Sequence, residues 1–143
     1  MEINNTKSYI TFIDSCWNEK NMNTLKTITS EDFIRKINGI QVAKNQSELE
    51  SHMHIYFKAF PDINVSIKKY FVKDHQLFIQ WLITGINTGI YGEFPATGKR
   101  IKIEGFTTAH FNNEGKLIEE DVCYNELDLL QQLGYTIKPP ILE

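Results

Sequence analysis

Several features that mark specialised classes of protein are scarce in this sequence. It has only two cysteines, Cys16 and Cys123, and neither stands at zinc-ligand spacing from a histidine. Its longest apolar runs, at 77–79 and 81–83, are far shorter than the ~20 residues that cross a bilayer. Its first residues carry no basic stretch followed by an apolar one, as a signal peptide would. We therefore expect a cytoplasmic protein with reduced thiols, without a membrane segment or a zinc site.

Clustered positive charge is also missing. The chain has 15 Lys and Arg against 18 Asp and Glu, a net charge of −3, and its basic runs are two residues long. A nucleic-acid partner requires a basic patch, so none is expected. The glycines at 85, 89, 92 and 98 have the spacing of strand ends and turns rather than of a phosphate-binding loop.

The chain is instead rich in aromatic side chains, which make up 12% of its 143 residues. Large flat side chains suit both protein cores and apolar pockets. A chain of this length is the size of one domain and can bury about two-thirds of its surface. We therefore expect a single domain over residues 1–143 with a core of its own.

The hydrophobic pattern changes period in the middle of the chain. Up to Pro61 it has helical spacing, and it predicts helices near 5–19, in the twenties, and from a capping box at 45–48 to residue 60. From Asp62 onward it alternates, and it predicts strands at 63–67, 77–83, 101–111 and 117–127, with a helical turn at 129–133. This order predicts an α+β fold, in which a curved antiparallel sheet packs its concave face on the N-terminal helices and leaves a conical cavity.

Four segments in order resemble a known family, the SnoaL-like polyketide cyclases and ester cyclases of the nuclear transport factor 2-like fold. The first is a Trp-Asn pair at the end of the first helix, and the second is Phe-x-Ala-Phe-Pro-Asp-Ile. The third is a glycine-rich stretch ending in Pro-x-Thr-Gly-Lys, and the fourth is Gly-Lys-x-x-Glu followed by Leu-x-Gln-x-Leu-Gly. The segments are Cys16–Asn21, Tyr56–Ile63, Gly85–Lys99, and Gly115–Glu120 with Leu129–Gly134.

The resemblance implies a cone-shaped α+β barrel, often dimeric, with an apolar pocket for a hydrophobic small molecule and no metal or organic cofactor. It also implies an Asp late in the chain that acts as acid and base in the aldol closure of a polyketide ester. That Asp aligns with Asn125, the family's His with Asn87, its Arg with Gln80 and its Trp with Asp121. Because an amide does not exchange a proton near neutral pH, Asn125 cannot act as the general base.

Asp121 and His110 are the remaining candidates for catalysis. A carboxylate in an apolar cone has a raised pKa and can serve as a base, and histidine titrates near neutral pH. The alternatives are an exposed acid that continues the Glu119-Glu120 pair and a histidine at the solvent end of its strand.

The register of the last hairpin decides between these alternatives. A four-residue loop at 112–115 pairs Phe111 with Lys116 and puts His110, Asp121 and Asn125 on one face. A bulged loop pairs Phe111 with Leu117 and separates them, because a slip of one residue exchanges the faces of a strand. The resemblance favours the first register.

The expected ligand-binding residues are the family's pocket positions and their aromatic neighbours. Trp17 is either core packing or the floor of the pocket, and the others are expected to contact the ligand. The set is Asn125, Trp17, Asn87, Phe106, Gln80 and Tyr124.

Three functions remain open. The chain is a cyclase, isomerase or hydrolase that uses Asp121 or His110, a binding module that has lost its base, or an interaction protein. The segment 77–83 is apolar on both strand faces, whereas helices can cover only one. We therefore expect a homodimer formed through the outer face of the sheet.

Overall fold

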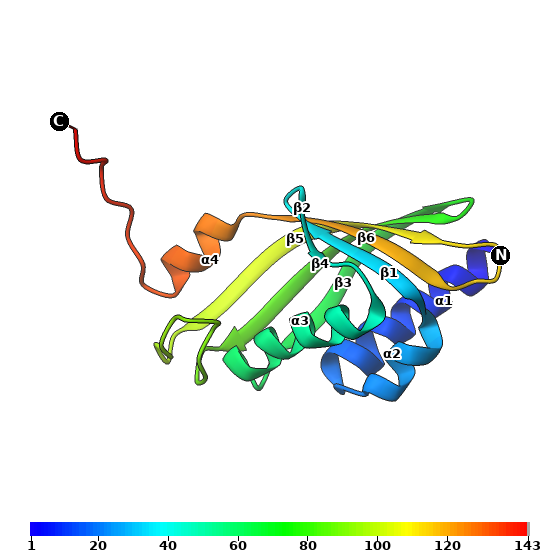
Figure 1. Cartoon of the computed structure of the whole chain (residues 1–143), viewed down its shortest axis with the longest axis horizontal. Coiled ribbons are helices and arrows are strands. Elements are labelled where there is room, and N and C mark those ends of the chain that lie inside the picture. The colour runs from blue at the N-terminus through cyan, green and yellow to red at the C-terminus, as the bar shows by residue number, and fades with distance from the viewer. Residues whose placement is uncertain (143) are drawn as a thin grey trace.

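The computed structural model describes residues 1–142, in which a curved sheet rests on a layer of helices (Figure 1). The N-terminal part forms α1 (Glu2–Thr11), its π-helical continuation η1 (Phe12–Asn18), and α2 (Met22–Ile28). Strands β1 (Thr29–Ile37) and β2 (Ile40–Ala43) and helix α3 (Gln46–Ala59) follow. The second half forms a meander of four strands and a last helix: β3 (Asn64–Lys73), β4 (Gln76–Ile86), β5 (Arg100–Phe111), β6 (Leu117–Tyr124) and α4 (Glu126–Gln132).

The described strands form one unclosed sheet in the order β2-β1-β6-β5-β4-β3. Within residues 1–142 every neighbouring pair is antiparallel except β1 and β6, which run parallel. The predicted α+β fold with helices on the concave face is thus confirmed, while the sheet is mixed rather than purely antiparallel. The parallel pair arises because the chain leaves β1, passes through α3 and the meander, and returns beside β1.

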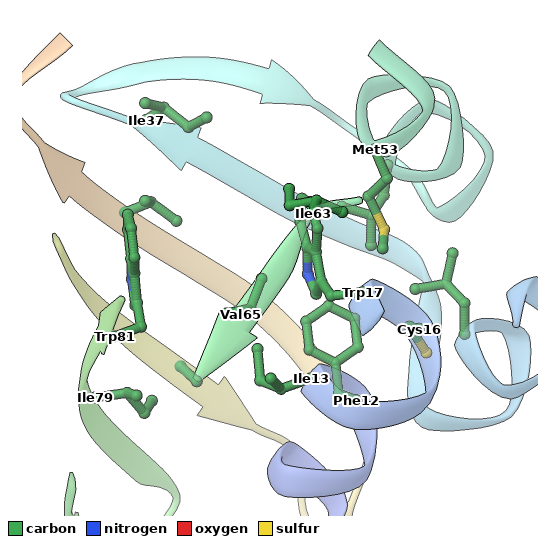
Figure 2. Packing of buried hydrophobic residues seen from close by; sticks show 14 of the residues in the cluster. Phe12, Ile13, Cys16, Trp17, Ile37, Met53, Ile63, Val65, Ile79 and Trp81 are labelled. Carbon is green, nitrogen blue, oxygen red and sulfur yellow. The ribbon is translucent and has the colours of Figure 1, made fainter. Parts of the chain in front are cut away.

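The first helix buries one face under the sheet. Tyr9, Phe12, Ile13 and Trp17 are all buried on this face, and Figure 2 shows the last three of them. A helix was expected here, but its second half is wound as a π-helix, in which residues five apart share a face. This winding places Phe12 and Trp17 in the same core.

Helix α3 begins and ends where the sequence predicts. The side chain of Asn45 accepts a hydrogen bond from the Glu48 amide at 2.8 Å, and Glu48 accepts one from the Lys44 amide at 3.1 Å. These contacts satisfy amides that have no partner within the helix. Pro61 follows the helix and prevents its continuation.

The concave face of the sheet carries the apolar alternation of the strands. On β4 the side chains of Leu77, Ile79 and Trp81 are buried, and on β5 burial alternates strictly from Ile101 to Phe111. Phe78 on the opposite face of β4 is 44% exposed. The outer face therefore stays uncovered in a single chain.

Two elements differ from the sequence-based expectation. Strand β2 was not predicted, and β6 ends at Tyr124 rather than at residue 127. The reason for the early end is Asn125, whose side chain accepts a hydrogen bond from the Asp128 amide at 3.0 Å and caps α4. A strand cannot continue through a residue that starts a helix.

The helices of residues 1–142 include none with the length and apolar character required to cross a membrane.

Gly105 lets Trp81 lie flat against β5. A Cβ built at Gly105 would lie 2.3 Å from Cζ2 of Trp81 and 2.9 Å from the carbonyl oxygen of Cys123. A glycine inside a strand commonly marks such a close approach. We predict that Gly105→Ala lowers the free energy of unfolding by about 1–3 kcal/mol, because a packed ring has to move.

Chemical denaturation measures this change. Lys102→Ala on the exposed face of the same strand should change the free energy of unfolding by less than about 0.5 kcal/mol. Equal stability of Gly105→Ala and the wild type would show that Trp81 does not lie as described.

Candidate functional site: a cavity under the sheet

The space between the concave face and the helices holds a cavity of about 60 Å³. Its walls are aromatic and branched apolar side chains, among them Trp17 from η1, Trp81 from β4 and Ile103 from β5. Figure 2 shows Trp17 and Trp81 on different elements around this region. Few of the residues that line the cavity carry polar groups, so these groups are the candidates for chemistry or ligand binding.

Glu120 on β6 places a carboxylate in the wall of this cavity. Its side chain is 2% exposed, although Glu119 and Asp121 on either side point outward. The hydroxyl of Tyr9 donates a hydrogen bond to its Oε2 at 2.6 Å. Its Oε1 lies 3.9 Å from Nη1 of Arg35, close enough for attraction between charges but too far for a hydrogen bond.

Arg35 reaches the cavity from β1. It is opposite Glu120 in the parallel pairing of β1 with β6, so the backbone register brings the two charges together. Its guanidinium lies over the ring of Trp17, 5.0 Å from the ring centroid. The aromatic face thus stabilises a cation that has almost no contact with water.

The environment raises the pKa of Glu120 above its ordinary value. Burial is the main cause, because it disfavours the charged form, while Arg35 and Tyr9 act in the opposite direction. Burial also raises the pKa of Tyr9, and Glu120 adds to the effect, so Tyr9 stays protonated as a donor. An upward shift brings the pKa of a carboxyl group closer to the pH at which a general acid or base works best.

Several polar atoms in this wall have no hydrogen-bond partner among residues 1–142. They are Oε1 of Glu120 and both Nε and Nη1 of Arg35. Buried polar atoms are nearly always paired in folded proteins. These atoms are therefore available to a molecule bound in the cavity.

Tyrosines surround one end of the cavity. Tyr56 from α3 and Tyr124 from β6 both line it. Tyr91 in the β4–β5 loop packs on Tyr56 with ring centroids 5.8 Å apart. Burial raises the pKa of Tyr124 and Tyr91, so both hydroxyls are protonated donors.

Two of the expected ligand-binding residues, Trp17 and Tyr124, line this cavity. Phe106 and Gln80 do not, because they face each other across β5 and β4 on the outer side of the sheet. Phe106 is 59% exposed. Asn125 lies at the start of α4, where its side chain caps the helix rather than facing the cavity.

Asn87 does not line the cavity but holds the β4–β5 loop in place. Its Oδ1 accepts hydrogen bonds from the amide and the hydroxyl of Thr97, and its Nδ2 donates to the carbonyl oxygens of Ala59 and Gly89. Asn87 thus ties both ends of the β4–β5 loop to α3. All its hydrogen-bonding capacity is used in this way.

Asp121 and His110 meet, but on the outer face. Nε2 of His110 lies 3.6 Å from Oδ2 of Asp121, and neither residue lines the cavity. Of the two alternatives for Asp121, a place in the cone and an exposed acid beside Glu119, the structure has the second. Asp121 and His110 are both partly exposed, next to Glu119.

Two features of the strands place His110 and Asp121 there. Strand β5 buries every second side chain from Ile101 to Phe111, so His110 faces outward in either register of the last hairpin. The register then decides which acid of β6 faces inward. Phe111 pairs with Leu117, as in the second of the two expected registers, but a shift between His110 and Phe111 then pairs His110 with Glu119. The extra residue is Ile118, which has no partner on β5. Beyond it Asp121 pairs with Thr108, so Asp121 lies on the outer face together with His110. Glu120, opposite Ala109, takes the inward position.

The outer cluster also brings together residue types that bind metals. One ligand atom each from His110, Glu119 and Asp121 lies within 4.8 Å of the others. Nζ of Lys36 lies 3.6 Å from Oε1 of Glu119, so a lysine rather than a metal ion can balance the negative charge of this carboxylate. We assign no metal to this cluster.

Glu120, Arg35 and Tyr9 were not among the site residues expected from the sequence, although the patterns around Arg35 and Glu120 held a signal. Arg35 stands between Phe33 and Ile37 at the spacing of one strand face, so an apolar face flanks it on both sides. Glu120 stands two residues before Val122 in the same way. A charged residue in phase with buried apolar neighbours was the signal to follow.

A family model of SnoaL-like polyketide cyclases matches residues 7–133. The chain belongs to the SnoaL-like polyketide cyclase family. This match confirms the resemblance that the four sequence segments indicate. No protein with a curated description matches the sequence.

Solved structures of SnoaL-like proteins have the same fold at low sequence identity. A candidate SnoaL-like polyketide cyclase from Jannaschia sp. CCS1 is 17% identical with a TM-score of 0.86, covering 97% of this chain and 95% of its own. AclR, a candidate hydroxylase from Streptomyces galilaeus, is 19% identical with a TM-score of 0.81, covering 94% and 98%. IdmH, a candidate polyketide cyclase from Streptomyces antibioticus, is 13% identical with a TM-score of 0.78, covering 92% and 99%.

The pair of Arg35 and Glu120 leads to a prediction about stability. In Arg35→Met the buried carboxyl of Glu120 loses the cation that lowers its pKa, and the pKa rises further. The folded protein then keeps a proton that the unfolded chain releases above the ordinary value of 4.5, so stability falls as pH rises. We predict a loss of about 3 kcal/mol at pH 7 that disappears as the pH falls toward 4.5.

Denaturant unfolding between pH 4.5 and 8 measures this dependence. The double variant Arg35→Met/Glu120→Gln removes both charges and should recover most of the loss at pH 7. A single variant whose loss does not depend on pH would contradict the pairing.

Proposed function

We propose that this protein performs acid/base chemistry on a hydrophobic small molecule, as a cyclase or isomerase, with Glu120 as the group that moves the proton. The observation that carries the proposal is a buried carboxylate in an apolar cavity with one oxygen that accepts no hydrogen bond from residues 1–142. The names of structural neighbours, among them candidate cyclases and a hydroxylase, are compatible with several chemistries and do not choose between them.

The groups around the cavity support proton removal next to a carbonyl group. Oε1 of Glu120 takes a proton from the carbon beside a substrate carbonyl, and the enolate oxygen accepts a hydrogen bond from Arg35. Tyr9 holds the other carboxylate oxygen at 2.6 Å and so orients the base. Donors fixed in advance where charge develops stabilise the transition state strongly.

Ring closure and isomerisation both follow from this enolate. In an aldol closure the enolate carbon attacks a second carbonyl of the same molecule, a C–C bond forms, and the new alkoxide takes the proton back from Glu120. In an isomerisation the same proton returns to a different carbon. In both cases Glu120 ends the cycle as it began.

The size of the cavity favours a second candidate function, a binding module for a small ligand. Pockets for drug-sized ligands measure about 300–1,000 Å³, far more than the space enclosed here. Only the reacting end of a polyketide fits, and the remainder has to pass Tyr56 and Tyr124. A small ligand fits inside the cavity as a whole and has no remainder that must pass these tyrosines.

We propose that a second copy of this chain covers the outer face of the sheet. Phe71, Phe78 and Phe106 on three adjacent strands are 68%, 44% and 59% exposed, and Leu82 is half-buried beside them. The ion pair of Lys68 and Glu104 stands beside this patch. An apolar centre with charges at its edge is typical of an interface.

Substitution of Glu120 tests the proposed chemistry. With an aromatic polyketide methyl ester as substrate, Glu120→Gln should lower kcat by at least about 100-fold, because the amide cannot accept the proton. Glu119→Gln, one residue away on the outer face, should leave kcat within about twofold. Substrate consumption and product formation are followed by mass spectrometry.

Two outcomes would overturn the assignment of Glu120. One is full activity of Glu120→Gln, and the other is loss of activity in Asp121→Asn with Glu120→Gln still active. A wild type that binds the ester without converting it would favour the binding module instead.

Molar mass in solution tests the proposed dimer. At micromolar concentration, light scattering should give about twice the chain mass for the wild type and the monomer mass for Phe106→Asp. Ile40→Asp, an equally exposed change at the β1–β2 turn, should remain dimeric. A monomeric wild type would refute the proposal.

A further inference from the structure

The guanidinium of Arg35 has fewer partners than a buried cation normally has. Its Nε and Nη1 are buried without an acceptor in the part of the chain that the structure describes, and Arg35 as a whole is 8% exposed. The nearest carboxylate oxygen, on Glu120, is 3.9 Å away. Buried donors without acceptors are costly, and the strongest acceptor for a guanidinium is a carboxylate.

The rest of the cavity suits the body of a small apolar acid. Two tryptophans, Trp17 and Trp81, and the branched chains of Ile103 and Val122 form much of its wall. By the same measure one water molecule needs about 10–15 Å³, so 60 Å³ corresponds to roughly four to six waters, or about 120–180 Å³ of liquid. This is the volume of one substituted aromatic ring.

From these two observations we infer that the cavity binds a small apolar monocarboxylate, of the size of benzoate, with its carboxylate against Arg35 and its apolar body between the tryptophans. Such a ligand occupies the cavity of the proposed function and competes with the substrate. The inference concerns binding and does not require turnover.

Binding of an acid changes the charge balance in the cavity. The empty site holds one positive charge on Arg35 and one negative charge on Glu120. Two carboxylates beside a single guanidinium share a proton, because like charges at short distance cannot both remain ionised. The ligand therefore binds together with one proton, which Glu120 accepts.

The other titratable groups around this pair stay fixed at neutral pH. Tyr9 on α1 and Cys16 on η1 face Glu120. Burial raises the pKa of Cys16 to about 12, and burial also raises the pKa of Tyr9 well above its ordinary value. His52 on α3 lies near Arg35. Burial lowers the pKa of His52 to about 4, and the positive charge of Arg35 adds to this effect. Among these groups, Glu120 is the one whose pKa burial raises from the acidic side toward neutrality.

Calorimetric titration with benzoate and with its neutral analogue benzamide tests the inference at pH 7. Glu120→Gln should bind benzoate at least tenfold more tightly than the wild type, because Arg35 then has no competing carboxylate. The double variant Arg35→Met/Glu120→Gln should lose at least tenfold relative to Glu120→Gln. Benzamide should bind all three proteins within about threefold of one another, and Glu119→Gln should bind both ligands as the wild type does.

The pH dependence gives an independent readout. The affinity of the wild type for benzoate should rise as the pH falls from 8 to 5, whereas that of Glu120→Gln should stay constant. Equal affinity for benzoate in the wild type and Glu120→Gln would overturn the inference. Equal affinity in Glu120→Gln and the double variant Arg35→Met/Glu120→Gln would overturn it as well. The proposed chemistry fails separately, if Glu120→Gln retains turnover.

Discussion

The ion pair between Arg35 and Glu120 is the constraint on which the site depends. The two residues lie 85 positions apart in the sequence and meet because β1 and β6 pair in parallel with these residues opposite each other. Both side chains are almost fully buried, so removing either charge leaves the other buried without an opposite charge and destabilises the fold. Tyr9 from the first helix adds the hydrogen bond that fixes the carboxylate, and the ring of Trp17 covers the guanidinium.

The helices and the sheet each contribute one side of this arrangement. The π-helical segment turns Trp17 toward the sheet, and the strand alternation turns Glu120 toward the helices. A buried pair of this kind does little for stability compared with apolar residues of the same size. Its presence in a largely apolar cavity is better explained by binding of a ligand, because three of its polar atoms have no hydrogen-bond partner among the described residues.

The sequence predicted the elements of the fold better than their registers. The period of the apolar residues located the long helix, α3 and the meander, since burial of one face imposes that period. The resemblance of four segments predicted the family and the concave packing. The pairing of β1 with β6 was not predictable, because no local pattern specifies a contact between residues 85 positions apart.

The candidate site was predicted only in part for the same reason. Trp17 and Tyr124 were expected at the cavity and lie there. For Asp121 and His110 the sequence left a place in the cone and a place at the surface open, and both lie outside. The alternation of β5 turns His110 outward, and the register of β6 pairs Asp121 with Thr108 on the same face and Glu120 with Ala109 on the inner one. Alignment with the family directed attention to Asn125, whose own side chain is occupied in capping α4. A slip of one residue exchanges the faces of a strand, so residue identities alone could not decide which acid faces the cavity.

The most direct test of this account is a ¹³C NMR titration of the side-chain carboxyl of Glu120, assigned by its absence in Glu120→Gln. The account predicts a midpoint above the ordinary value of 4.5 for glutamate, because burial outweighs the attraction of Arg35. It also predicts that Arg35→Met moves this midpoint further upward. A midpoint at or below 4.5 that does not respond to Arg35→Met would mean that Glu120 faces water and that the cavity has no carboxylate.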